Sequence, residues 1–327
     1  MGYTAGDTIL DDEYNTFVNS SSSPFGYNHF AGVGALQYGL GQTEIATVAA
    51  GGTIQASNWN TLFTGIDTIA NHTNDTMTTR GAVTAGDTIA IKAAVAADLA
   101  TLAASVGGGS VNATALDTSS AKQTSSASAQ WTANHTVEHT VTFANANTMR
   151  YFFNGGGKIR VVGDRTGAGL AGDGGSESNT KDADWTALFN AIGNFDIGST
   201  VSTRSGSGET LTTNGLGNGF YDLGTGYTVL IKLTSDNSSY TSNYIEISAK
   251  TNAAPGTAVS MTVKYDSRDG SADNTFTSGN TSNIDSQVDR VGVARVRTFI
   301  LSPNDEQGLA SDITESSTAA TSNTTDG

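Results

Sequence analysis

Residues 137–162 carry the clearest alternation of apolar and polar positions in this sequence. Apolar side chains dominate every second position in Val137–Phe143, Met149–Phe153 and Ile159–Val161. Successive side chains of a β-strand point to opposite faces, so this period of two predicts three half-buried strands. Asn, Ala and Gly fill the two connectors, and Asn and Gly tolerate the conformations of tight turns. The pattern therefore predicts a three-stranded antiparallel meander.

Phe152 is the informative exception in this pattern, because in a strand it lies opposite Tyr151 and Phe153. Such a strand has large apolar groups on both faces, and both faces need a cover. One face packs on the domain core. The other face is expected to be covered either by a packed helix or by a neighbouring subunit.

Alternation continues beyond the meander and predicts a β-rich C-terminal half. One segment differs, because Trp185, Leu188, Phe189 and Ile192 recur at helical spacing and predict a helix over 182–192. Strands joined by short turns, without regular helical crossovers, favour an antiparallel β-sandwich with one packed helix. The predicted strands are Phe220–Leu223, Tyr227–Leu233, Tyr244–Lys250, Val259–Tyr265 and Val291–Leu301.

An internal repeat organises the N-terminal part, where Thr4–Ile9 recurs as Ala49–Ile54 and as Thr84–Ile89. A short helix is expected after each copy, with Asp11 and Ser57 as N-caps of the first two. Helical stripes support the second and third helices, while residues 25–41 are expected to form a loop. The stripes are Trp59, Leu62, Phe63, Ile66 and Ile69, and then Val95, Leu99, Leu102 and Val106.

These patterns predict a mainly β protein with a small α-helical N-terminal region and an antiparallel β-sandwich C-terminal domain. Residues 1–106 form the helical repeat region in this division. Residues 107–129 are a Ser-, Ala- and Gly-rich linker. Residues 130–302 form the sandwich, and residues 303–327 are a polar tail.

Charge excludes several classes of partner. The net charge is -15 with no cysteine, and the sequence pI is about 4.4. An acidic chain repels phosphate, which argues against nucleic-acid binding and against anionic membrane surfaces. Without cysteine there are no disulfides and no thiolate chemistry. Neither a secretory signal nor an apolar run of membrane-spanning length is visible, so assembly in a cytoplasm without membrane insertion is expected.

His135 and His139 match the HxxEH string of zinc peptidases, which operates on a helix. Here the flanking pattern is that of a strand. Histidines four apart on a strand share a face but lie about 13 Å apart at roughly 3.3 Å per residue, too far to share a metal. The two histidines are therefore interpreted as surface or edge-strand residues.

Two other motifs fit their usual chemistry poorly. Residues 167–172 match GxGxxG, but Asp173 and further glycines follow where a dinucleotide site needs a helix. A crowded acidic loop offers hard oxygen ligands for Ca²⁺, although the EF-hand order is absent and a solvated loop is the alternative. Its members are Asp164, Asp173, Glu177, Asp182 and Asp184.

No catalytic residue and no cofactor is assigned. The GxSxG elbow of serine hydrolases is absent from the sequence. A carboxylate pair for glycoside hydrolysis stays open, because sequence alone does not reveal such a pair. Trp131, Trp185 and Tyr221 are candidates for stacking on sugars, although aromatic residues more often belong to a core.

Several strings resemble virion structural proteins of tailed bacteriophages, particularly marine phages. They are Tyr38–Gln42, Gly52–Leu62, Val141–Val162 and Tyr240–Ile247. The resemblance implies a non-enzymatic tail-, neck- or fibre-associated protein that resides in the virion. It supplies no catalytic residue. Alternatives are a module that binds a host glycan or receptor, with or without depolymerase activity, and a capsid decoration protein.

Self-association and docking to other virion proteins are the expected modes of action. The stripe on the second helix has only two other short helices nearby to cover it, and uncovered apolar surface marks contacts. The N-terminal region is therefore predicted to attach to the particle while the sandwich projects. The residues assigned to these contacts are Tyr14, Trp59, Leu62, Phe63, Ile66 and Phe152.

Overall fold

A computed structural model gives the structure of this chain. The residues that it describes are 11–32, 39–40, 42–73, 75–85, 92–106, 123–126, 134–167, 180–237, 240–267, 275–278, 281–284, 292–301, 313–314 and 320–324.

Two compact units make up the chain, and each combines segments that are distant in sequence. The first, called the helical unit, comprises Met1–Asp117, Ala144–Lys158 and Leu301–Ile313. The second, called the sandwich unit, comprises Thr118–Phe143, Ile159–Ile300 and Thr314–Gly327. Residues 144–158 thus group with the helices, although they lie inside the range 130–302 predicted for the sandwich.

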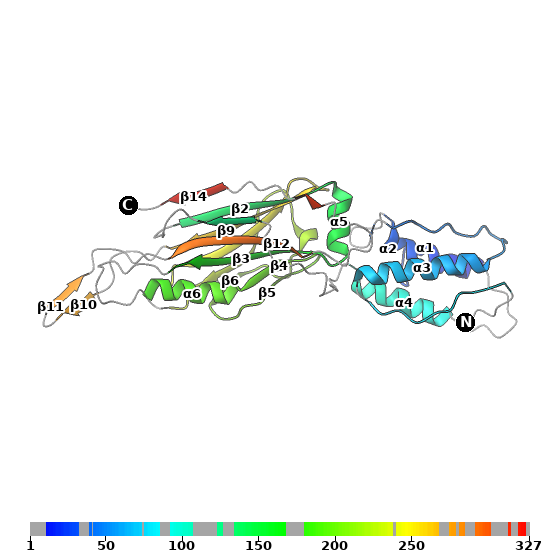
Figure 1. Ribbon diagram of the computed structural model, residues 1–327, viewed down its shortest axis with the longest axis horizontal. Helices are drawn as coiled ribbons and strands as arrows, with labels where there is room; N and C mark the ends of the chain where they lie inside the picture. Colours follow the sequence, from blue (N-terminus) through cyan, green and yellow to red (C-terminus); the bar gives the residue numbers. More distant parts are fainter. Residues whose placement is uncertain are drawn as a thin grey trace. The chain divides into compact units, whose positions relative to one another are not determined.

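Helices build the first unit, and the four earliest share one hydrophobic core (Figure 1). The ring of Tyr14 meets that of Trp59 edge-on at 5.3 Å between centroids. The helices predicted from the stripes are confirmed, and the stripe residues from Trp59 to Val106 are buried. Ser57 is not an N-cap as predicted, because α3 begins one residue earlier, at Ala56. The helices are α1 (Asp11–Asn19), α2 (Tyr27–Ala31), α3 (Ala56–Thr73), α4 (Lys92–Ser105) and α5 (Ala146–Asn154).

Strands build the second unit. Among the described residues, one sheet has five strands in the order β1 (Gln123–Ser126), β12 (Val293–Leu301), β3 (Lys158–Thr166), β4 (Asn194–Ile197), β5 (Ser202–Arg204). The other has the order β13 (Ile313–Thr314), β2 (Asn134–Phe143), β9 (Ala258–Asp266), β8 (Tyr244–Thr251), β7 (Thr228–Thr234), β6 (Thr210–Asn214). In addition, β14 (Ala320–Thr324) pairs with β2, and β10 (Thr275–Ser278) pairs with β11 (Thr281–Ile284).

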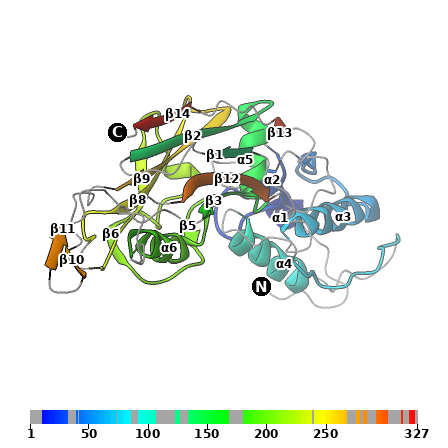
Figure 2. The same ribbon diagram turned by 60° about the vertical axis from the view of Figure 1, so that its left-hand side comes forward.

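The strands of the two sheets make up the sandwich unit (Figure 2). Side chains from the second sheet reach across to the first. His139 of β2 contacts Thr298 of β12, with 2.7 Å between Nδ1 and Oγ1. The Tyr265 hydroxyl of β9 donates to the carbonyl of Arg295 in β12 at 3.2 Å. Every pairing with a described register is antiparallel. The predicted β-sandwich-like fold is confirmed.

The packed helix predicted over 182–192 is also confirmed. It is α6 (Thr180–Ile192), which contacts β7 and β8. Trp185, Leu188 and Ile192 are buried on it. The ring of Trp185 meets that of Tyr265 of β9 at 5.9 Å between centroids, so α6 extends the core between the sheets.

The predicted meander is wrong, because its middle segment is the helix α5 and its outer segments lie in different sheets. Asn145 caps α5, since its side chain accepts a bond from the Thr148 amide at 2.9 Å. Met149, Phe152 and Phe153 stand at positions i, i+3 and i+4, and all three are buried. Over the five residues from Met149 to Phe153, the apolar positions fit both the helical spacing and the period of two. The N-cap at Asn145 stabilises the helix.

Two smaller predictions are also wrong. Residues 220–223 were expected to form a strand, but Phe220–Asp222 forms a single 3-10 turn, η1. Residues 25–41 were expected to be a loop, but they contain α2, whose Tyr27, Phe30 and Ala31 are buried. Both elements are too short for a periodic signal.

Candidate functional site

The stripe assigned to partner contacts fills the core of the helical unit instead. Trp59 is 2% exposed, Phe63 is 6% exposed, and Tyr14, Leu62 and Ile66 are fully buried. The missing cover comes from α2, which the sequence did not reveal, together with α1 and α4. The premise of an uncovered stripe is therefore wrong, and these side chains are not available on the surface.

Phe152 is likewise a core residue, and the two-faced strand proposed for it does not exist. It lies on α5, fully buried, with its ring 5.1 Å from that of Phe153. Gly157 follows so closely that a Cβ there would lie 2.5 Å from the Phe152 ring. The large apolar side chain that was expected on the second face of a strand therefore belongs to a helix.

His135 and His139 lie on β2 as predicted, but they are buried rather than on the surface. Burial lowers the pKa of each to about 4. Neither ring nitrogen of His135 has a hydrogen-bond partner among the described residues. In the described part of the chain, no three His, Asp or Glu side chains are placed to hold a metal ion.

The acidic residues that the structure describes are engaged by donors. Asp164 accepts two bonds from Arg295, at 2.6 and 2.7 Å, and one from Arg297 at 2.7 Å. Asp182 pairs with Arg165 at 2.7 Å. These guanidinium groups occupy the oxygens that a calcium ion would need.

Other candidates fall outside the described residues or into the core. Asp173, Glu177, Trp131 and most of the GxGxxG string lie outside the described residues. Trp185 is buried in the sandwich core. Asp184, the last member of the acidic loop, accepts a bond from the Ser235 hydroxyl.

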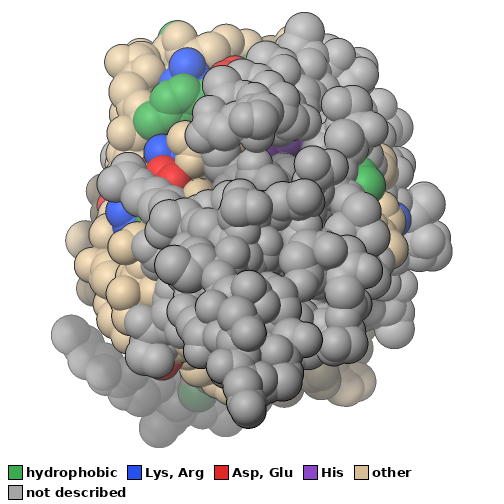
Figure 3. All heavy atoms as spheres, turned by 90° about the vertical axis from the view of Figure 1, so that its left-hand side faces the viewer, with side chains coloured by type: hydrophobic (Ala, Val, Ile, Leu, Met, Phe, Trp, Pro, Cys, Tyr) green, Lys and Arg blue, Asp and Glu red, His purple; other side chains and the backbone are tan. Residues whose placement is uncertain are grey.

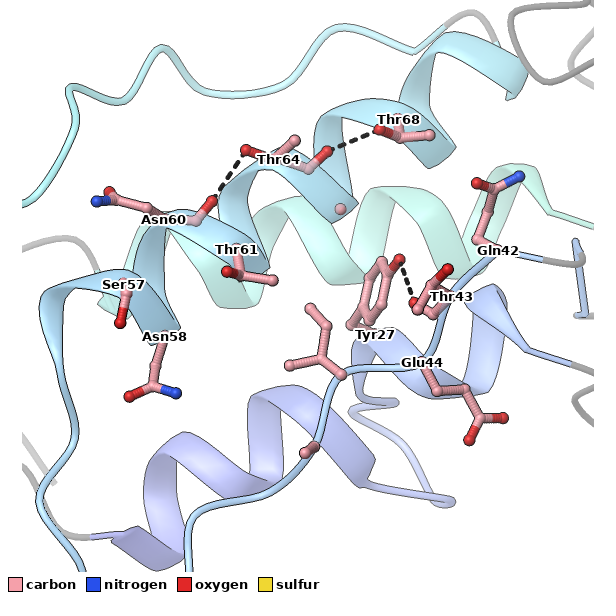
Figure 4. Close-up of a pocket in the computed structure, with 13 residues that line it drawn as sticks. Tyr27, Gln42, Thr43, Glu44, Ser57, Asn58, Asn60, Thr61, Thr64 and Thr68 are labelled. Atoms are coloured by element: carbon pink, nitrogen blue, oxygen red, sulfur yellow. Dashed lines mark hydrogen bonds between the residues drawn. The ribbon is translucent and has the colours of Figure 1, made fainter.

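A groove on the helical unit is the candidate binding site among the described residues (Figure 4). Its volume is about 790 Å³. One wall is the outer face of α3, and the other is the segment Gln42–Ala46, called the strap. The residues that line it are Tyr27, Gln42, Thr43, Glu44, Ile45, Ala46, Ser57, Asn58, Asn60, Thr61, Thr64, Gly65 and Thr68.

Tyr27 and Gly65 bring the two walls together. A Cβ on Gly65 would lie 2.6 Å from the Tyr27 ring, so only glycine lets α3 approach this closely. The Tyr27 hydroxyl donates to the Thr43 carbonyl at 3.1 Å. Burial raises the pKa of Tyr27 to about 12, so the phenol keeps the proton that it donates.

Asparagine side chains of the helices hold the strap and its continuation by paired hydrogen bonds. Asn28 of α2 donates to the Ile45 carbonyl and accepts from the Ile45 amide, both at 2.8 Å. Asn15 of α1 does the same to Val48, again at 2.8 Å for both bonds. Each amide thus replaces the neighbouring strand that an extended backbone would otherwise need.

The same arrangement recurs on α3, where Asn60 donates to the Val83 carbonyl at 3.0 Å and accepts from its amide at 2.8 Å. Asn15 and Asn60 occupy equivalent positions in the aligned strings Tyr14–Phe17 and Trp59–Leu62. The shared asparagine was therefore visible in the repeat. Its partner was not, because the bonded backbone lies 33 and 23 residues further along.

The groove offers hydrogen bonds rather than acid–base chemistry. Glu44 is the one titratable carboxyl in the lining, and Figure 4 shows its side chain pointing away from α3. Threonine hydroxyls and strap backbone form the walls. Such a surface suits a polypeptide segment that is recognised mainly through its main chain.

The visible face of the sandwich unit shows no cluster of one charge among its described side chains. In Figure 3, Lys or Arg side chains lie next to Asp or Glu. Within the sandwich unit, Arg160 of β3 and Asp196 of β4 form an ion pair with bonds of 2.7 and 2.9 Å. Hydrogen bonding to Asp196 raises the pKa of Arg160.

Comparisons of the chain with protein-family models, with curated proteins and with solved structures find no match. Among the described helices, none combines the length and the apolar character needed to cross a membrane.

Proposed function

We propose that this chain is a non-enzymatic structural component of a tailed-phage virion, associated with the tail, neck or fibre. It acts by self-association and by docking to other particle proteins, and it is assembled in the host cytoplasm. The resemblance of the strings Gly52–Leu62 and Val141–Val162 to virion proteins supports this proposal. The observation that carries it is the groove, where a strap held on one edge lies beside an open space lined by hydroxyls.

The strap suits docking because its backbone is fixed before a partner arrives. Three side-chain bonds from α2 hold Thr43 and Ile45. A binding segment therefore does not have to order the strap, and this lowers the entropic cost of association. A catalytic site would instead need convergent titratable groups, which the groove lining lacks.

Particle incorporation tests the proposal directly. Particles are purified on a density gradient from cells infected with the phage that carries the coding sequence, while the host also expresses a tagged full-length chain. The tagged chain is expected to sediment with complete particles and with isolated tails. Recovery only in the soluble fraction would refute a virion role.

A full-length chain is needed for this experiment. The helical unit includes residues 144–158, which contain the helix α5. A truncation near Ser128 would remove residues 1–117, the larger part of that unit, and leave α5 without them. Recovery with empty heads instead of tails would identify a capsid decoration protein.

One observation favours a second candidate, binding to a host surface glycan. Tyr227, directly before β7, is 41% exposed, and the Lys250 ammonium lies 4.2 Å from its ring centroid. An exposed aromatic ring beside a hydrogen-bond donor is a common way to hold a sugar. Specific binding on a glycan array that Tyr227→Ala abolishes, with Val201→Ala at another exposed apolar side chain as control, would support this candidate over the purely structural one.

A further inference from the structure

Three polar side chains of the sandwich unit are buried where the first turns of α6 approach the turn between β7 and β8. Lys181 is 1% exposed, Asp184 is 5% exposed, and Asn243 is fully buried. Lysine and aspartate are almost never buried to this extent unless they are paired. None of the three lines the groove, so the cluster is a separate feature of the molecule.

Asp184 connects the other two residues. It follows Lys181 by three positions on α6, a spacing that places both side chains on one face of the helix, with Cβ atoms about 5–6 Å apart. On its other side, the Nδ2 of Asn243 donates to Asp184 Oδ2 at 3.5 Å. The second carboxylate oxygen accepts a bond from the Ser235 hydroxyl. A carboxylate thus lies between a lysine on its own helix and an amide on the neighbouring turn.

Backbone bonds hold Asn243 in this position. Its carbonyl accepts from the Ser235 amide at 3.0 Å, and its own amide donates to the Tyr240 carbonyl at 2.9 Å. Contacts between α6 and the strands β7 and β8 hold the helix against the same turn. The three side chains therefore meet without any movement of the backbone.

Burial favours the neutral forms that an amine–amide reaction needs. A low-dielectric interior disfavours charged groups, so a proton passes readily from a buried ammonium to a carboxylate beside it. This transfer produces a neutral amine, which is a nucleophile, and a carboxylic acid, which is a proton donor. Groups held side by side in a folded chain also react at a high effective concentration.

We propose that Lys181 and Asn243 form an isopeptide bond in the folded chain, with Asp184 as the proton-transfer group. The neutral Nζ of Lys181 attacks Cγ of Asn243, and a C–N bond forms. Asp184 donates its proton to Nδ2, the Cγ–Nδ2 bond breaks, and ammonia leaves with the electron pair. Asp184 then takes the surplus proton from Nζ, so the reaction consumes no oxidant and no further reactant.

The bond joins α6 covalently to the turn between β7 and β8. The chain has no cysteine and therefore no disulfide, and an isopeptide bond restricts the unfolded chain in the same way as a disulfide does. The inference goes beyond the proposed function and does not depend on it. A chain that enters particles without the bond keeps the virion role, and a chain with the bond that never enters particles keeps the bond.

Mass spectrometry of the denatured full-length protein tests the bond. The measured mass should be lower than the mass of the sequence by one ammonia. After protease digestion, fragment spectra should show the peptide that contains Lys181 joined to the peptide that contains Asn243. A mass equal to that of the sequence, or the absence of the joined peptides, overturns the proposal.

Two variants assign the roles. Lys181→Met removes the nucleophile and Asp184→Asn removes the proton-transfer group, and each variant should show the full mass of its own sequence. Lys264→Met, at a lysine of β9 that is about one-third exposed, is the matched control and should still lack one ammonia. The joined peptides are read from the wild-type chain, so the test holds even where a variant fails to fold.

A second source of ammonia loss is distinguished by the same variants. An asparagine before a glycine, such as Asn214 before Gly215, can close a ring with its own backbone and release ammonia. That reaction needs neither Lys181 nor Asp184. A loss of ammonia that persists in Lys181→Met therefore overturns the isopeptide bond.

Discussion

Gly163 of β3 shows how one residue sets the spacing of the two sheets. A Cβ at this position would collide with the Tyr265 hydroxyl, which reaches over from β9. Gly163→Ala should therefore destabilise the protein by about 1–3 kcal/mol, as overpacking usually does. Urea denaturation measures the loss.

A double variant checks that Tyr265 is the cause. Tyr265→Phe removes the colliding atom and costs about 1 kcal/mol through its lost bond to Arg295. In this background Gly163→Ala should cost clearly less than it does alone. Strict additivity of the two changes would point to another source of strain.

The buried histidines predict a stability loss in acid. Burial lowers the pKa of His135 and His139 to about 4, whereas an unfolded histidine titrates near about 6.5. Between these values the unfolded state binds more protons, so stability is complete above about pH 6.5 and falls as the pH drops toward about 4. The loss should be on the order of 1–3 kcal/mol for each histidine, measured as the urea midpoint against pH.

Removing the imidazoles provides the control for this pH dependence. The double variant His135→Leu and His139→Leu should lose much of the slope between about pH 4 and pH 6.5. Its absolute stability is not the readout, because His139 also gives up its contact with Thr298. A slope unchanged from wild type would assign the acid sensitivity to other groups.

Asn60 provides a third prediction at this scale. Asn60→Ala leaves both Val83 backbone groups without their partner, at a cost of about 1–2 kcal/mol, reduced by about 0.5 kcal/mol through the better helix propensity of alanine. Thermal unfolding of the helical unit measures the change. Thr64→Ala, one turn further on the exposed face of α3, should change stability by less than about 0.5 kcal/mol.

At the scale of elements, β9 combines a buried and a more exposed face. Met261 is 1% exposed, so Met261→Ala should destabilise the sandwich unit by about 2–5 kcal/mol. Thr262→Ala, on the opposite face of the same strand, is the control and should cost much less. Similar losses from both, read from urea denaturation, would contradict the assignment of faces.

Long elements with a consistent period could be predicted from the sequence, and short ones could not. Strands β2 and β9 alternate between buried and less buried positions over most of their length, as their sequences predict. In β7 a bulge interrupts the pattern, so that Leu230 and Ile231 are both buried. In α5 the apolar residues fit both periods, and the cap at Asn145 settles the conformation. The groove was beyond prediction because it depends on asparagine bonds to backbone that is distant along the chain.

At the scale of the whole molecule, charge opposes self-association. Each copy carries a net charge of -15, and added salt screens repulsion between copies. Self-association should therefore strengthen between about 20 mM and about 500 mM NaCl, as measured by sedimentation equilibrium. Weakening over this range would indicate contacts made by opposite charges.

The placement of α5 in the helical unit has a consequence for synthesis on the ribosome. Helices α1 to α4 are complete at residue 105, but α5 ends only at residue 154, after β2 of the other unit has been made. At roughly 5–20 residues per second, translation of this interval takes about 2–10 s. During that time Asn154, which donates a hydrogen bond to the Gly39 carbonyl in the folded protein, has not yet been made. The core that α1 to α4 share contains no residue of α5, so these helices are expected to pack together before the later segment leaves the exit tunnel and joins them.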